Sequence, residues 1–171
     1  MALSEYSLPL PDFDAPVRVL LVVAPFYRDI ANALIDGATG LLDTAGIAHD
    51  MVEVPGALEI PTAIRIADRD SNFDGFVALG CVIRGATTHY ETVCNDSSRA
   101  LTILGLEGLC IGNGILTVET AAQAEERADP SRMNKGAGAA AAALHLISLA
   151  RRWRPAGRPR TEPGSYQIAR K

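Results

Sequence analysis

The sequence has no apolar run long enough to cross a membrane. Its apolar stretches, such as residues 19–23 and 137–143, are far shorter than the roughly 20 residues that a membrane-spanning helix needs. The first 16 residues contain three prolines and several acidic side chains, and they lack the basic region and apolar run of a secretory signal. We therefore expect a cytoplasmic protein with no membrane partner.

Cysteine is scarce, and its placement suggests neither a disulfide nor a metal site. Cys81, Cys94 and Cys110 occur singly, and no group of His, Cys, Asp or Glu has the spacing of metal ligands. We expect all three cysteines to be small buried apolar residues. The G-x-G-x-x-G and Walker patterns of nucleotide sites are also missing. The sequence therefore predicts no metal and no dinucleotide cofactor.

Positive charge is scarce in the body of the chain. The formal net charge is −4, but residues 151–171 hold seven Arg or Lys against one Glu, a balance of +6 that leaves −10 for residues 1–150. An acidic body argues against nucleic acid as the main partner. The end of the chain is also rich in Pro and Gly, which predicts a disordered tail over residues 154–171.

What the sequence does contain is a regular alternation of apolar and amphipathic segments. A chain of 171 residues, 48% hydrophobic and 21% charged, is typical of one globular domain, which we place at residues 17–153. The composition and periodicity predict strands at residues 17–23, 49–54, 75–83 and about 108–115. They predict five helices: one over about 30–45, a second that follows the second strand and ends at about 68, and others over about 88–104, 121–128 and about 135–152.

This alternation predicts an α/β fold, a three-layer αβα sandwich with a parallel sheet. Crossover connections are right-handed, and the common doubly wound orders place the first strand inside the sheet, so we expect a flavodoxin-like order of 2-1-3-4. Residues 1–16 show no periodicity and are expected to form an arm or an added edge strand. A ligand should bind at the switch point, where the loops after the first and third strands meet.

The segment after the third strand, IRGATTHYE, predicts an anion site. It contains Gly85, Ala86, Thr87, Thr88 and His89. The two small residues allow close approach of the backbone to a ligand, and either threonine can cap the helix that begins there. The first turn of a helix attracts anions, and a histidine with an unperturbed pKa of about 6.5 could transfer protons beside it. An ordinary helix start with a surface histidine would have the same pattern.

Two further segments follow the first and second strands. In APFYRD, Phe26 and Tyr27 lie on the loop that the switch-point rule selects, where an aromatic ring could stack on a planar heterocycle or simply fill the core. In VPGALEIP, Pro55 and Gly56 predict a tight turn that leaves the main chain of residues 57–59 available to ligand hydroxyls. Glu59 could instead only favour the helix dipole.

A fourth segment, ERADPSRMNKGAG, precedes an alanine-rich helix. Arg127, Arg132 and Lys135 lie in it. The planar guanidinium of arginine suits a phosphate because it can donate two hydrogen bonds, although cations between helices are commonly just solvated. The small residues that follow could pack on the chain's own sheet or form an oligomer interface.

Together and in this order, the four segments resemble the lumazine synthase family over residues 17–153. The likeness rests on GATTHYE after one strand, PGALEIP after the preceding strand, and an Arg seven residues before NKG. It implies a flavodoxin-like fold assembled as homopentamers that can build larger shells, with each active site shared between adjacent subunits. It also implies the condensation of 5-amino-6-(D-ribitylamino)uracil with 3,4-dihydroxy-2-butanone 4-phosphate to 6,7-dimethyl-8-ribityllumazine, without any cofactor.

The resemblance also implies a role for each candidate residue. The Phe26 ring stacks on the pyrimidine, and His89 transfers protons. Arg127 binds the phosphate with Lys135 close by, both from the adjacent subunit. The other implied substrate-binding residues are Gly56, Ala57, Leu58, Glu59, Val82, Ile83, Gly85, Ala86, Thr87, Thr88 and Asn113. Residues that depart from those common in the family are Tyr27, Leu58, Asn113 and Pro130.

Two alternatives to this function stay open. Lys135 could form a Schiff base with a ketose phosphate, as the lysine of an aldolase does. Alternatively, the chain could bind a flavin or lumazine without catalysis, as a carrier or an assembly scaffold. The presence of both His89 and Arg127 argues against the second alternative.

Overall fold

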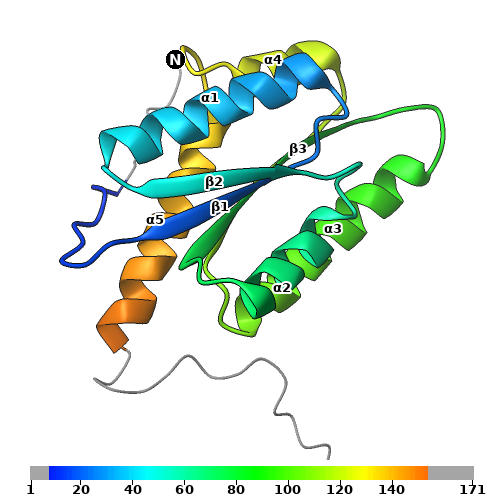
Figure 1. The fold of residues 1–171 in the computed structure, drawn as a ribbon. Helices are drawn as coiled ribbons and strands as arrows, with labels where there is room; N and C mark the ends of the chain where they lie inside the picture. The colour runs from blue at the N-terminus through cyan, green and yellow to red at the C-terminus, as the bar shows by residue number, and fades with distance from the viewer. Residues whose placement is uncertain (1–7, 154–171) are drawn as a thin grey trace, which may run out of the picture.

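The apolar runs of the sequence form a four-stranded parallel sheet at the centre of the protein (Figure 1). The computed structural model describes residues 8–153, so the predicted tail and the first seven residues of the predicted arm lie outside the described part. The strands are β1 (Arg18–Val23), β2 (Ala48–Glu53), β3 (Gly75–Ile83) and β4 (Ile111–Val118). Their order is β2-β1-β3-β4 and all pairs are parallel, which confirms the predicted topology.

Helices cover both faces of this sheet (Figure 1). One face carries α1 (Arg28–Thr44), α4 (Ala121–Ala128) and α5 (Lys135–Trp153), and the other carries α2 (Ile60–Asp70) and α3 (His89–Leu106). Because side chains alternate along a strand, β1 contributes Val19 and Leu21 to one core and Leu20 and Val22 to the other. This confirms the three-layer αβα arrangement and explains why β1 has an almost unbroken aliphatic sequence.

One prediction about the start of an element is wrong. The fourth strand begins at Ile111 instead of near residue 108, because Gly108 has a φ of 99° and its amide closes the end of α3 on the carbonyl of Gly105. Residues 8–16 form no edge strand. They lie against the end of α5, where the guanidinium of Arg151 donates hydrogen bonds to the carbonyls of Ala15 (2.9 Å) and Pro16 (2.6 Å).

The small residues of α5 bring this helix very close to its own sheet and to α1. A Cβ atom added at Gly112 of β4 would lie 1.8 Å from the carbonyl oxygen of Ala139. One added at Gly136 would lie 2.1 Å from the carbonyl oxygen of Leu34. Glycine is therefore required at both positions, and packing within the chain accounts for the alanine-rich sequence of the buried face of α5.

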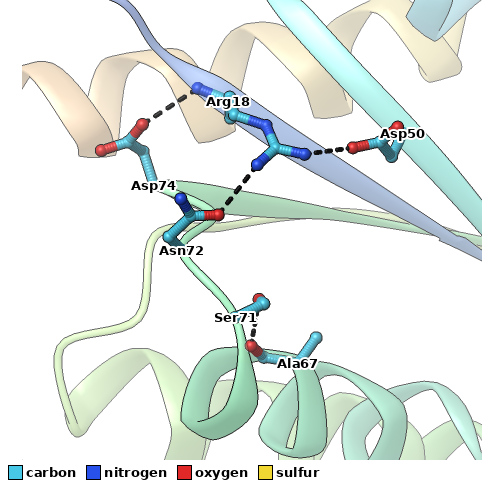
Figure 2. A network of polar contacts seen from close by, with 6 residues as sticks. All are labelled: Arg18, Asp50, Ala67, Ser71, Asn72 and Asp74. Atoms are coloured by element: carbon cyan, nitrogen blue, oxygen red, sulfur yellow. Dashed lines mark hydrogen bonds and ion pairs between the residues drawn. The ribbon is translucent and has the colours of Figure 1, made fainter.

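The amino edge of the sheet, where the strands begin, is closed by polar contacts (Figure 2). The backbone amide of Arg18 donates to Asp74 (2.9 Å), and its guanidinium donates to Asn72 (2.8 Å) and Asp50 (2.7 Å). Arg151 reaches the same Asp74 at 3.3 Å. These contacts connect β1 to β2, to the loop before β3 and to α5. None of the helices within residues 8–153 is both long and apolar enough to span a membrane.

Candidate active site

A cleft of about 410 Å³ opens at the carboxyl edge of the sheet, where the strands end. Its lining comes from the loop after β1, the loop after β2, the end of β3 and the first turn of α3. The predicted residues that line it are Phe26, Tyr27, Gly56, Ala57, Leu58, Glu59, Val82, Ile83, Gly85, Thr87 and His89. A cleft of this size suits a small molecule, and it lies at the switch point between β1 and β3, as the sequence predicted.

An exposed aromatic ring forms one wall of the cleft. Phe26 is 73% exposed, so it does not fill the core, and the core-filling interpretation is wrong. Its ring meets that of Tyr27 at a centroid distance of 5.1 Å and an interplanar angle of 72°, an edge-to-face contact. Tyr27 also packs against the core beneath α1. The cleft therefore offers a flat apolar face whose neighbour is anchored in the fold.

The turn after β2 forms a second wall. The amide of Glu59 donates to the carbonyl of Gly56 (3.2 Å), which closes the turn just before α2. Glu59 is the N-cap residue of α2, but its side chain makes no capping hydrogen bond. Ala57 is buried, whereas Leu58 is 39% exposed. Main-chain groups and one carboxylate are thus presented together at this wall.

The turn before α3 leaves its backbone donors available. Within residues 8–153, the amides of residues 85–88 have no hydrogen-bond acceptor. The amide of His89 reaches only the hydroxyl of Thr87, at 3.4 Å. Thr88 occupies the N-cap position without making a capping bond, so of the two threonines predicted as possible caps only Thr87 accepts from the first turn. Exposed amides at the start of an 18-residue helix make a favourable anion site.

Arg84 forms a charged cluster beside this turn that sequence reasoning missed. Its guanidinium pairs with Glu91 and donates to Glu119 at 2.6 Å, and it lies 4.1 Å from the ring centroid of Tyr90. The hydrogen bond from Arg84, followed by one from its own amide, lowers the pKa of Glu91. The spacing of Arg84 and Glu91 across the turn was the only signal, because Glu119 is brought in by the fold.

The cysteines are only partly as predicted. Cys81 and Cys110 are buried, but Cys94 is half-buried on α3, so the expectation of complete burial is wrong for that residue. Cys81 contributes to the apolar floor of the cleft. Burial raises the pKa of its thiol to about 11, so the thiol is neutral at physiological pH. No group of three or more potential ligands among residues 8–153 could hold a metal ion.

Five predicted site residues do not line the cleft. They are Ala86, Thr88, Asn113, Arg127 and Lys135. Ala86 and Thr88 belong to the turn itself, and Asn113 lies on β4, where its side chain accepts a hydrogen bond from the amide of Ile115 (3.0 Å). Arg127 lies in the last turn of α4 and donates to the carbonyl of Gln123 (3.2 Å). Lys135 is the first residue of α5.

Some lining residues were not predicted, and the cleft lacks one kind of group. Ala24, Tyr90 and Val93 also face it, and the last two follow His89 along the first turns of α3. No lysine or arginine is among the lining residues within the described chain. The cleft therefore has a base and exposed amides but no cation of its own with which to hold a phosphate.

A doubly wound αβα sheet with a cleft at its switch point defines a small-molecule-binding protein of the flavodoxin-like class. Sequence comparison identifies the family. The profile described as 6,7-dimethyl-8-ribityllumazine synthase matches residues 16–151. The chain belongs to this family, which confirms the resemblance inferred from its motifs.

Individual relatives agree with this assignment. The chain is 61% identical over 168 residues to the 6,7-dimethyl-8-ribityllumazine synthase of Jannaschia sp., covering 97% of this chain and 94% of that protein. It is 49% identical over 136 residues to the protein of the same name from Novosphingobium aromaticivorans, covering 80% of this chain and 98% of that protein. For the one from Sphingopyxis alaskensis, the identity is 52% over 132 residues, with 77% and 94% covered.

Proposed function

We propose that the protein catalyses the condensation of 5-amino-6-(D-ribitylamino)uracil with 3,4-dihydroxy-2-butanone 4-phosphate, which yields 6,7-dimethyl-8-ribityllumazine, phosphate and water. Membership of the family supports this reaction. The observation that carries it is the convergence of the Phe26 ring, the turn at residues 56–59 and the turn holding His89 on one cleft. A planar base, a polyol chain and a phosphate each have a matching wall there.

The pyrimidine substrate fits the apolar side of the cleft. Its ring stacks on Phe26, which is exposed in the free subunit and loses contact with water when covered. Val82 and Ile83, at the end of β3, border the ring. The ribityl hydroxyls bind main-chain groups of residues 57–59, next to the carboxylate of Glu59.

The phosphate of the second substrate binds at the start of α3. The amides of residues 85–88, which lack acceptors within residues 8–153, donate to its oxygens, and the helix dipole favours its charge. The lining residues supply no cation. We therefore assign Arg127 and Lys135 of an adjacent subunit to this phosphate, in a homopentamer whose head-to-tail interfaces each complete one active site.

His89 transfers the protons that the reaction requires. The primary amine of the pyrimidine attacks the ketone and water leaves to form an imine. Phosphate is then eliminated, and the ribitylamino nitrogen attacks the remaining carbonyl carbon and closes the ring with loss of a second water. A histidine beside the leaving phosphate can act as acid and base near neutral pH. Holding two substrates in register supplies the rest of the acceleration, since effective molarity contributes roughly 7–11 kcal/mol in well-oriented reactions.

The direct test mixes the purified protein with both substrates and follows the green fluorescence of the lumazine product. Product formation above the rate without protein is expected. Binding of lumazine without product formation would instead support a carrier or scaffold. Borohydride reduction with the ketose phosphate tests the remaining alternative, because a labelled Lys135 would indicate a Schiff base, whereas product formation without labelling supports direct attack by the pyrimidine amine.

The shared site has its own test. His89→Ala and Arg127→Ala variants are each expected to be slow, because each damages every site of a homo-oligomer. After the two are unfolded and refolded together, an active site with both native residues forms where an unaltered His89 meets an unaltered Arg127. Random mixing then restores roughly a quarter of wild-type activity. No recovery in mixed oligomers would place the two residues in the same subunit's site.

A further inference from the structure

Arg84 is a charged residue next to the cleft to which the proposed reaction gives no role. It directly follows β3, and its backbone amide donates to the carbonyl of Val118 at 2.9 Å. Its guanidinium spans from Glu91 in the first turn of α3 to Glu119 after β4, with 2.6 Å between Nε and the Glu119 carboxylate. The turn at residues 85–88 is thereby tied at its base to β4 and at its far end to α3.

The same guanidinium fixes part of the cleft wall. It lies over the ring of Tyr90 at 4.1 Å from the centroid, a distance typical of a cation–π contact. Tyr90 lines the cleft and immediately follows His89. Arg84 therefore contacts Tyr90 and Glu91, which follow the turn at residues 85–88, without lining the cleft itself.

Glu91 gives this arrangement an electrostatic consequence. Its carboxylate lies in the first turn of α3, has the same sign as a phosphate, and also accepts a hydrogen bond from its own amide. A carboxylate at a helix N-terminus competes with any other anion for that positive end. Pairing with Arg84 neutralises this competitor, and both residues of the pair lie within three positions of the turn in sequence.

We propose that Arg84 is a positioning residue for phosphate binding, which holds the turn at residues 85–88 in place and neutralises Glu91 beside it. This inference rests on the proposed function in one respect, namely that a phosphate binds at the start of α3. The side chains of Arg84 and Glu91 are 40% and 48% exposed, and ion pairs with such exposure contribute little to folding stability. The main effect of the pair is therefore on the phosphate.

The test compares Arg84→Ala, Glu91→Gln and the double variant. Arg84→Ala is expected to raise the Michaelis constant for the ketose phosphate about tenfold and that for the pyrimidine less than about twofold, because only the phosphate contacts the turn. Glu91→Gln alone is expected to change either constant less than about twofold. The double variant is expected to regain part of the lost affinity, because the unneutralised carboxylate of Glu91 is gone while the contacts of Arg84 with Glu119 and Tyr90 stay lost.

Arg65→Ala is the matched control. Arg65 pairs with Glu107 at 2.5 Å and with Asp68 at 3.6 Å, away from the cleft. Its replacement therefore removes a paired positive charge without affecting the turn at residues 85–88. It should leave both Michaelis constants unchanged. Arg84→Lys keeps the charge but not the planar guanidinium, so it should weaken binding of the ketose phosphate less than Arg84→Ala does. Arg84→Gln gives the same comparison if the alanine variant does not fold.

Calorimetry with inorganic phosphate gives a readout that does not depend on turnover. Weaker phosphate binding in Arg84→Ala, partly restored in the double variant, supports the inference even if the wild type makes no lumazine. Absence of lumazine formation would count only against the proposed reaction. Equal increases in both Michaelis constants, an equal effect of Arg65→Ala, or no recovery in the double variant would each overturn the positioning role.

Discussion

At the amino edge of the sheet, polar side chains bind one another, whereas at the carboxyl edge several backbone amides have no partner among the described residues and remain available to a ligand. Arg18 joins Asp50, Asn72 and Asp74 in one connected group (Figure 2). At the other edge, the amides of residues 85–88 have no acceptor within the described chain, and Phe26 is 73% exposed. A parallel sheet thus separates the end that stabilises the fold from the end that binds ligands.

The direction of the helices explains this difference. In a βα unit each helix begins near the carboxyl edge, so its free amides and the positive end of its dipole collect there. Two arginines are exceptions at this edge. The pairs of Arg84 with Glu91 and Glu119, and of Arg28 with Glu53, resemble those of the amino edge. The following changes test whether function and stability divide between the edges in this way.

The largest effect is expected at His89. His89→Ala should lower the turnover number roughly ten- to a thousandfold, the scale of a general acid–base residue, with little change in binding of a phosphate ligand. His49→Ala, which removes a histidine paired with Asp43 at 2.9 Å on β2, is the matched control and should retain full activity. Steady-state kinetics check both, and an unchanged turnover number for His89→Ala would reject its assigned role.

A smaller effect is expected at Arg127. Arg127→Ala removes a charge-assisted contact to the phosphate, worth about 1.5–3 kcal/mol, so the Michaelis constant for the ketose phosphate should rise roughly ten- to a hundredfold. Arg132→Ala, which loses a surface pair with Glu126 at 3.2 Å, is the control and should change this constant little. If the constant is unaltered in Arg127→Ala, the cation of the site lies elsewhere.

The buried thiol beneath the cleft predicts a pH dependence of stability. Below pH 9 the thiol of Cys81 is protonated in both states, but between pH 9 and about 11 it ionises only in the unfolded chain, so stability falls as the pH rises. This titration contributes a loss of about 2 kcal/mol, which Cys81→Ala should abolish in urea unfolding at pH 8 and pH 11. Cys94→Ala, which removes a half-buried thiol, should reduce the pH dependence of stability by less than Cys81→Ala does. Identical pH slopes for Cys81→Ala and the wild type would contradict the burial effect.

The smallest effect is expected at the amino edge. Arg18→Ala loses two side-chain hydrogen bonds and a contact 4.8 Å from the ring centroid of Phe73, and should lower the free energy of unfolding by about 1 kcal/mol. Activity at 25 °C should stay unchanged. Arg69→Ala, which loses only its pair with Asp70, should cost less. Reduced turnover in a folded Arg18→Ala protein would show that the two edges are coupled.

The fold could be predicted from the sequence because its signals are local. The aliphatic run of β1 and the nine-residue run of β3 match the predicted strands, and turn residues mark most helix ends. The start of β4 was misplaced because apolar residues already follow the turn at Gly108. A hydropathy pattern does not reveal the φ of 99° that makes this residue part of a turn. The choice between a free arm and an edge strand stayed open in the sequence because the partner of this segment, Arg151, lies 135 residues or more away.

The site was predictable where its parts follow strands and was not where it depends on contacts between them. Phe26, the turn at residues 56–59 and His89 follow three strands whose ends must meet in this topology. The partners of Arg84 lie 7 and 35 residues away in sequence, on two different elements. Exposed charged residues carry no periodic pattern that would connect them. The positions of Arg127 and Lys135 relative to the cleft remain predictions.

The close packing of α5 against α1 limits which residues are tolerated at the start of α5. Lys135 is the first residue of that helix, and Gly136, next to it, admits no methyl group against the backbone of Leu34. A larger residue there would tilt the helix and carry the lysine amine away with it. The absence of a side chain at Gly136 therefore fixes the orientation of Lys135, which is proposed to bind the phosphate in the site of a neighbouring subunit.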